Sequence, residues 1–186
     1  MLSRRRAALA AISVFAAAAT LLLAMGRNPI CTCGVVDLWV GSRDSPRTSQ
    51  MLFDWYSLSH IVHGLLFYAA LWLAARRWPV EWRFVVALAV EATWEVIENT
   101  PMVIDRYRAE TAALGYNGDS VLNSLSDISM MALGFLLARK LPVWGAVALL
   151  VVLELVPLVV IRDNLALNIW NLLAPNAAVQ AWQTGG

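Results

Sequence analysis

The chain has 186 residues, of which 60% are hydrophobic and 15% are charged, and its mean hydropathy is +0.62. This length suits a single domain over residues 1–186, and the apolar content favours an integral membrane protein. The net charge of only +1 excludes the strongly basic surface that is typical of nucleic-acid-binding proteins. We therefore expect an all-α membrane protein whose partners are membrane lipids and not nucleic acid, with protein partners left open.

The first predicted span covers residues 7–25 and follows a run of three arginines. A basic start before an apolar run is also typical of a secretory signal peptide. However, this run is long for one, and no clear Ala-x-Ala cleavage motif follows. We therefore expect an uncleaved span with its basic end in the cytoplasm. The polar residues 26–56 would then form a long outer loop.

Two cysteines, Cys31 and Cys33, lie in this predicted outer loop. They could be an incidental pair, a local disulfide in an oxidising compartment, or a metal-binding pair. The sequence has no second cysteine pair that would complete a structural zinc site.

Four more apolar segments are long enough to cross a hydrocarbon core of about 30 Å. They cover residues 57–75, 84–104, 119–138 and 143–161. Residues 165–173 are too short to span, so we expect an interfacial helix there, near Trp170 and Trp182. The result is a helical bundle of about five spans plus a short interfacial C-terminal helix. Basic residues gather in its predicted inner loops, which places the N-terminus in the cytoplasm and the C-terminus outside.

The third span carries three acids at helical spacing, Glu91, Glu95 and Glu98. Residues at i, i+4 and i+7 lie on one helix face, so these acids form a single stripe. A charged acid at the bilayer centre costs about 2.5–3.5 kcal/mol, so such groups normally face protein or water and find a partner. The stripe therefore predicts a polar site within the membrane.

Other helices place ionisable side chains at a similar predicted depth. Counting about 1.5 Å per residue from the outer end of each span puts seven polar residues in the outer half of the membrane. They are His60, His63, Glu95, Glu98, Asn123, Asp127 and Glu154. By the same count Glu91 lies nearer the inner half and suits a structural role. Asp119 follows a glycine turn and suits a helix N-cap, so it ranks below Asp127 as a site residue. Gly64 and Gly134 would allow the helices to approach closely.

Three interpretations of this cluster stay open. In the first, His60, His63, Glu95 and Glu98 bind a divalent metal, for which imidazole and carboxylate favour Zn, Fe or Mn. Glu95, Glu98 and Asp127 would then be the catalytic residues of a hydrolase or transferase that acts on a lipid or envelope substrate. In the second, the acids form the pathway of an ion- or proton-coupled transporter or accessory protein. In the third, they are a structural network that joins the helices of a membrane scaffold. Whether the protein is an enzyme stays open.

Arg106 and Arg108 flank the predicted outer end of the third span. The simplest interpretation is interfacial snorkelling of two long side chains. The functional alternative is that they hold an anionic head group above the cavity, together with Asn123.

Three stretches resemble an uncharacterised family of bacterial inner-membrane proteins, a domain-of-unknown-function family. They are Phe53–Gly64, with the two histidines; Glu91–Tyr107, with the acidic stripe; and Gly115–Asp127. The resemblance covers most of the chain from about residue 25 onward. It implies a multi-pass protein of the bacterial cell inner membrane and brings no activity, cofactor or substrate. The pattern of acids is also loosely similar to VanZ-like membrane proteins, over too short a stretch to transfer anything. The Lys-x6-Arg-Pro motif of lipid phosphatases is absent from the sequence.

Overall fold

A computed structural model describes residues 2–111 and 115–185 of the chain. Within these residues the regular structure is helical, apart from one isolated bridge between Trp39 and Phe53. The helices are α1 (Leu2–Ala24), α2 (Ser57–Ala75), α3 (Val80–Glu98), α4 (Pro101–Glu110), α5 (Val121–Lys140), α6 (Val143–Ile161), α7 (Leu165–Leu173) and α8 (Ala177–Thr184). The expectation of an all-α helical bundle is confirmed.

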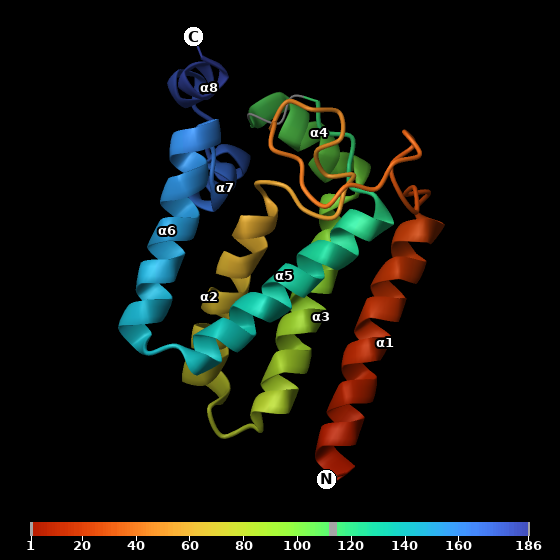
Figure 1. The fold of residues 1–186 in the computed structure, drawn as a ribbon, viewed down its shortest axis with the longest axis vertical. Helices are drawn as coiled ribbons and strands as arrows, with labels where there is room; N and C mark the ends of the chain where they lie inside the picture. The colour runs from red at the N-terminus through yellow and green to blue at the C-terminus, as the bar shows by residue number, and fades with distance from the viewer. Residues whose placement is uncertain (1, 112–114, 186) are drawn as a thin grey trace.

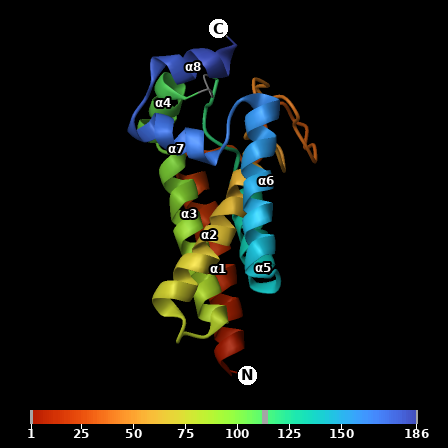
Figure 2. The same ribbon diagram turned by 90° about the vertical axis from the view of Figure 1, so that its left-hand side faces the viewer.

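The five long helices stand side by side, and the short ones gather at one end of the bundle (Figures 1 and 2). The N-terminus and the tight connections α2–α3 and α5–α6 lie at the opposite end from α4, α7 and α8. The long segment of residues 26–56 joins the short helices at their end. One end of the molecule therefore consists of short turns, and the other end contains the short helices and most of the irregular backbone.

Four of the long helices are apolar enough to cross a membrane, namely those within Arg4–Ala24, Ser57–Ala75, Val121–Lys140 and Val143–Ile161. Much of α6 faces outward, where Val143 and Val159 are about four-fifths exposed, as suits contact with lipid. The fifth long helix, α3, is 19 residues long, as α2 is, but it carries the acidic stripe. It packs against α1, α2 and α5, so its acids are sheltered by protein.

The third predicted span, residues 84–104, is wrong at its outer end. Helix α3 ends at Glu98, and a separate helix α4 begins at Pro101. Proline has no backbone N–H and its ring disfavours a helical residue before it. Thr100 is accordingly extended, with ψ 150°, and the chain changes direction there. The spans otherwise match the long helices to within a few residues.

Close contact between α2 and α5 depends on two glycines. A Cβ atom added at Gly64 would collide with the backbone of Met131, and one added at Gly134 would collide with the backbone of Ile61. Small residues of this kind let helices in membranes approach closely. The expected role of both glycines is confirmed. Beside this contact, Leu88, Ile128, Met131 and Phe135 belong to a buried apolar cluster between α1, α3 and α5.

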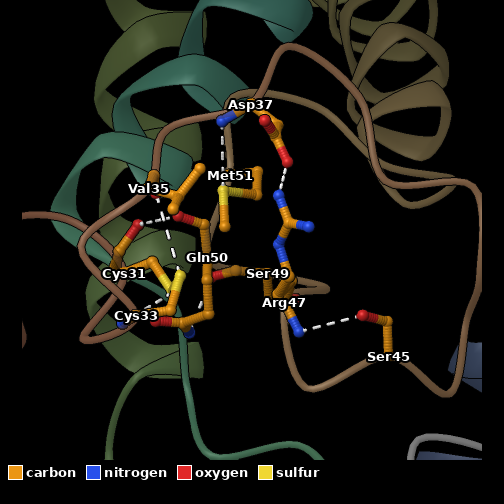
Figure 3. The surroundings of a disulfide bond; sticks show 10 residues. Cys31, Cys33, Val35, Asp37, Ser45, Arg47, Ser49, Gln50 and Met51 are labelled. Carbon is orange, nitrogen blue, oxygen red and sulfur yellow. Dashed lines mark hydrogen bonds and ion pairs between the residues drawn. A yellow bond between two sulfur atoms is a disulfide. The ribbon is translucent and has the colours of Figure 1, made fainter.

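The segment of residues 26–56 is held together by local contacts rather than by regular structure. Cys31 and Cys33 form a disulfide, and Met51 packs with Cys31 in a small buried cluster (Figure 3). Nearby, Arg47 pairs with Asp37, whose backbone N–H points at the sulfur of Met51. The disulfide is one of the three arrangements that the cysteine pair allowed.

Asp163 fixes the connection that follows α6. Its carboxylate accepts hydrogen bonds from the Tyr56 hydroxyl, the Asn164 backbone N–H, and the side-chain amides of Asn168 and Gln183. One buried acid therefore ties the start of α2 to α7 and α8. Burial raises the pKa of Asp163 to about 6, while the hydrogen bond from Tyr56 opposes this rise.

Candidate functional site

Both histidines of α2 meet one acid of α3, Glu91. The Nδ1 atom of His60 lies 2.5 Å from Glu91 Oε1, and the Nδ1 atom of His63 lies 3.0 Å from the same oxygen. His63 Nδ1 also lies 3.1 Å from Glu91 Oε2. Glu91 is fully buried, and its carboxylate is contacted by the two imidazoles rather than by solvent. The expectation that Glu91 lies nearer the inner half than the other polar residues is wrong, because its carboxylate contacts both histidines. Its structural role stays a prediction.

Glu95 lies one helical turn beyond Glu91 and faces the same group of side chains. Its Oε1 is 3.5 Å from His60 Nδ1. Neither carboxylate oxygen has a hydrogen-bond partner among the described residues, although the side chain is 1% exposed. An unpaired buried carboxylate is costly, so Glu95 is the residue in this cluster that most requires a further partner.

Asp127 approaches the cluster from α5. Its Oδ2 atom lies 3.8 Å from His60 Nε2, and its Oδ1 atom accepts a hydrogen bond from Ser57 at 2.9 Å. Asp54, in the loop before α2, shapes this corner by accepting the backbone N–H groups of Ser49 and Tyr56. Burial raises the pKa of Asp54, an effect that these two hydrogen bonds oppose.

Asp119 joins the cluster from the loop before α5, beside Glu95 and Glu98. Its Oδ2 atom accepts hydrogen bonds from Asn99 at 2.8 Å and from the Tyr116 hydroxyl at 2.9 Å. The expectation that Asp119 caps a helix is wrong. Ser120 is the N-cap of α5, and its side chain accepts the backbone N–H of Asn123. Asp119 is therefore free to turn its carboxylate into the site.

Three groups of side chains are compact enough to hold a metal ion. They are His60, His63 and Glu91; His60, Glu95 and Asp127; and Glu95, Glu98 and Asp119. Within each group the potential ligand atoms all lie within 4.8 Å of one another. All the predicted metal ligands and catalytic acids occur among these groups, together with Glu91 and Asp119, but no group contains both histidines with Glu95 or Glu98. The predicted set of four metal ligands is therefore divided among the three groups.

A cavity of about 400 Å³ runs along these groups between α2, α3 and α7. Its lining includes the ionisable side chains of His60, His63, Glu98, Asp119 and Asp127. It also includes apolar side chains, among them Leu66, Val90 and Ile169, each of which is nearly half exposed. The cavity therefore connects the ionisable cluster with the apolar outer surface of the bundle.

A second, more polar cavity of about 630 Å³ lies under the segment of residues 26–56. Ser49, Tyr56 and Tyr116 line both cavities, so the two spaces meet at these side chains. The ionisable cluster is thus flanked by an apolar space on one side and a polar space on the other.

The three residues predicted to hold a head group are engaged elsewhere in the chain and do not line the cavity beside the cluster. Arg106 donates to the carbonyl of Leu172 at 3.0 and 3.2 Å, and so joins α4 to α7. Arg108 donates to the carbonyl of Tyr116 and to the side chain of Asn117. Asn123 is buried and donates to the carbonyl of Met51. Their head-group role stays a prediction.

Comparison with known proteins gives a consistent assignment. Residues 22–185 match the model of a protein family of unknown function, DUF2585. The chain is 52% identical to a UPF0314 protein of Paracoccus denitrificans over 98% of this chain and 95% of the relative. It is 49% identical to a UPF0314 protein of Novosphingobium aromaticivorans over 100% and 96%. No solved structure matches. The expected membership of an uncharacterised bacterial family is confirmed, and the chain belongs to the DUF2585 family.

Proposed function

We propose that the protein is a metal-dependent hydrolase or transferase of the bacterial cell inner membrane, acting on a lipid or envelope-linked substrate. The observation that carries the proposal is the buried Glu95 carboxylate. Both of its oxygens lack a hydrogen-bond partner among the described residues, yet it lies beside His60 and Asp127. A divalent cation would satisfy these oxygens and offset the negative charge of the surrounding acids.

The donor set is consistent with catalytic metal chemistry. Imidazole and carboxylate ligands favour Zn, Fe or Mn, and catalytic sites leave a position open for water or substrate. Glu91 faces Nδ1 of both histidines. This is the arrangement in which a carboxylate orients a histidine that binds metal through its other nitrogen. A metal-bound water is a nucleophile near neutral pH. Glu98 lines the cavity and is partly exposed, so it would be accessible either to a bound ion or, as a general base, to a reacting water.

The shape of the cavity favours an amphipathic substrate. The apolar lining residues would accommodate the hydrocarbon chain of a lipid, and the reacting group would lie beside His60 and His63. The adjoining polar cavity, reached past Tyr56 and Tyr116, would supply water or a water-soluble acceptor. The lipid would enter from the apolar surface, and water or an acceptor would enter from the polar cavity. This arrangement is compatible with both hydrolysis and group transfer.

The proposed location is supported by charge and by the disulfide. At the end of the bundle that holds the N-terminus, Arg76 and Arg77 follow α2, and Arg139 and Lys140 end α5, as the positive-inside rule requires of a cytoplasmic face. The Cys31–Cys33 disulfide lies at the other end, which suits an oxidising compartment. The site would then open on the outer side of the inner membrane.

Metal analysis of the detergent-purified protein tests the proposal. We expect at least one Zn, Fe or Mn per chain in the wild type and a loss of metal in His60→Ala. Glu91→Gln should weaken metal affinity about 10- to 100-fold through the lost orientation of the histidines. Glu154→Gln is the matched control, because Glu154 is a membrane-embedded acid that accepts the first backbone N–H groups of α7 instead.

A wild type without stoichiometric metal would overturn the metal-dependent proposal, as would an unchanged metal content in His60→Ala. The reaction itself is tested by incubating the metal-loaded protein with vesicles of bacterial inner-membrane lipids and analysing the lipids by mass spectrometry. We expect a lipid product with the wild type and with Glu154→Gln, and none with Glu95→Gln. If Glu95→Gln changes only the stability of the protein, the acids form a structural network.

A further inference from the structure

Two of the three metal-compatible groups share a single residue, Glu95. One group consists of His60, Glu95 and Asp127, and the other of Glu95, Glu98 and Asp119. Each supplies three potential ligand atoms within 4.8 Å of one another, which is the number of protein ligands typical of a catalytic metal with an open position. The shared residue therefore lies between two complete sets of ligands.

Glu95 has the chemistry of a bridging ligand. It carries two oxygens, and neither has a hydrogen-bond partner among the described residues. A single ion bound through one oxygen would leave the other buried and unpaired. With one ion on each oxygen, both would be satisfied, and two-metal sites hold their ions about 3.5–4 Å apart.

The charge of the cluster also favours two ions. Five carboxylates gather here, from Glu91, Glu95, Glu98, Asp119 and Asp127. Among the described residues no lysine or arginine lines the cavity beside them, and Arg27 donates to the backbone carbonyl of Asp119 rather than to its carboxylate. Two divalent cations would supply four positive charges against these five acids, whereas one would leave most of the repulsion in place.

The second group has the surroundings of a ligand set. Asn99 and Tyr116 both donate hydrogen bonds to the same oxygen of Asp119, at 2.8 and 2.9 Å. The Asn99 side-chain oxygen accepts the backbone N–H of Asp119 at 2.7 Å, which fixes the backbone at this position as well. Hydrogen bonds that orient a carboxylate ligand are typical of the surroundings of metal sites.

From these observations we propose that the protein binds two divalent cations bridged by Glu95. One is held by His60 and Asp127, and the other by Glu98 and Asp119. Glu91 is a positioning residue that orients both histidines. The inference rests on the proposed function in requiring that metal binds at all. It adds the substrate class, because adjacent metals stabilise both the attacking and the leaving oxygen of a phosphoryl group. The expected substrate is a lipid that carries a phosphate ester.

The test is the metal stoichiometry of the purified protein reconstituted with Mn²⁺ and freed of excess ion. We expect two Mn²⁺ per chain in the wild type and in the Glu154→Gln control. Glu98→Gln, which preserves side-chain volume, should retain one. Helical circular dichroism and elution from a sizing column would verify that each variant is folded.

Electron paramagnetic resonance of the Mn²⁺-loaded protein provides a second measurement. Two bridged ions should give an exchange-coupled spectrum, and Glu98→Gln should give the six-line spectrum of an isolated ion. One Mn²⁺ per chain in the wild type would overturn the two-ion inference and leave the proposed function standing. No bound metal would overturn both. Two uncoupled ions, or two ions retained in folded Glu98→Gln, would also overturn the bridged site.

Discussion

At the scale of single residues, Glu91 illustrates how an error in the position of a helix end becomes an error in the expected depth of a side chain. The sequence placed the outer end of the third span at residue 104, whereas α3 ends at Glu98. These six residues correspond to about 9 Å along a helix. With the shorter helix, Glu91 rises to the level of His60 and His63. Its spacing within the acidic stripe was already visible, so the missing information was the position of the helix end.

Asp119 was ranked below Asp127 as a site residue for a different physical reason. An aspartate after a glycine turn and before an apolar run has a sufficient local role as a helix cap. The neighbouring Ser120 is an equally good cap, and it is the residue that takes this role. Local sequence offers two candidates for one position and cannot reveal which carboxylate is released to face Glu95 and Glu98. That choice is made by Asn99 and Tyr116.

Asp163 gives a pH-dependent prediction at the residue scale. Its pKa is about 6 in the folded protein against an ordinary value of 3.8, so the folded state binds this proton more tightly than the unfolded state does. The stability that depends on the protonated form is complete below pH 3.8 and is lost as the pH rises to about 6. We expect the thermal unfolding midpoint of the wild type to fall over this range relative to Asp163→Asn.

The comparison with Asp163→Asn removes the contribution of the other acids, because both proteins share them. The variant should be less stable at every pH in the range, since its amide cannot accept all four hydrogen bonds that reach Asp163. The difference between the two midpoints should be largest at the acidic end. A difference that stays constant, or widens towards pH 6, would contradict the assignment.

At the scale of elements, hydropathy was sufficient to locate the long helices because each must cover about 30 Å of hydrocarbon with apolar residues. It could not divide α3 from α4, because the apolar run continues through Met102, Val103 and Ile104. Pro101 was the signal that could have done so. The helix after it lies at the same end of the bundle as α7 and α8 (Figure 2). The contact of Arg106 with the Leu172 carbonyl joins α4 to α7.

The contact between α2 and α5 yields a prediction at the same scale. Gly134→Ala would drive a Cβ atom into the backbone of Ile61, so the two helices must separate. We expect a lower thermal midpoint in detergent, equivalent to about 1–3 kcal/mol of overpacking. Gly145→Ala is the matched control. Its Cβ would make only ordinary contacts, 3.4 Å from Pro142, and alanine favours the helix over glycine by about 1 kcal/mol.

The two substitutions are chemically identical and both lie in membrane helices, so their difference isolates the helix–helix contact. Gly145→Ala should be as stable as the wild type or more stable. If Gly134→Ala were equally stable, the backbones of α2 and α5 would have to lie further apart than the structure places them. Metal binding provides a second readout, since His60 on α2 and Asp127 on α5 flank this contact.

At the scale of the whole molecule, the structure of the apolar bundle could be predicted from the sequence, whereas that of the irregular end could not. The bundle follows from hydropathy and from charges at its turns. The segment of residues 26–56 has no periodicity, and its conformation depends on contacts distant in sequence. Ser49 accepts the backbone N–H of Ser120, and Asn123 donates to the carbonyl of Met51. These contacts hold the segment against α5, and its residue Ser49 lines both cavities, so this part of the site was beyond sequence-based prediction.

The orientation of the whole molecule gives the last prediction. The bundle places its N-terminus and the α5–α6 connection at one end and its C-terminus at the other (Figure 1). We expect alkaline phosphatase fused after Gly186 to be active, because it requires the oxidising outer compartment. The same enzyme fused after Lys140 should be inactive, since the positive-inside rule predicts that the basic residues at that position stay in the cytoplasm. Green fluorescent protein at the same two positions should give the opposite pattern. Fluorescence after Gly186 with phosphatase activity after Lys140 would show the opposite orientation, with the ionisable cluster nearer the cytoplasm. The proposed envelope substrate would then have to be replaced by one from the inner leaflet.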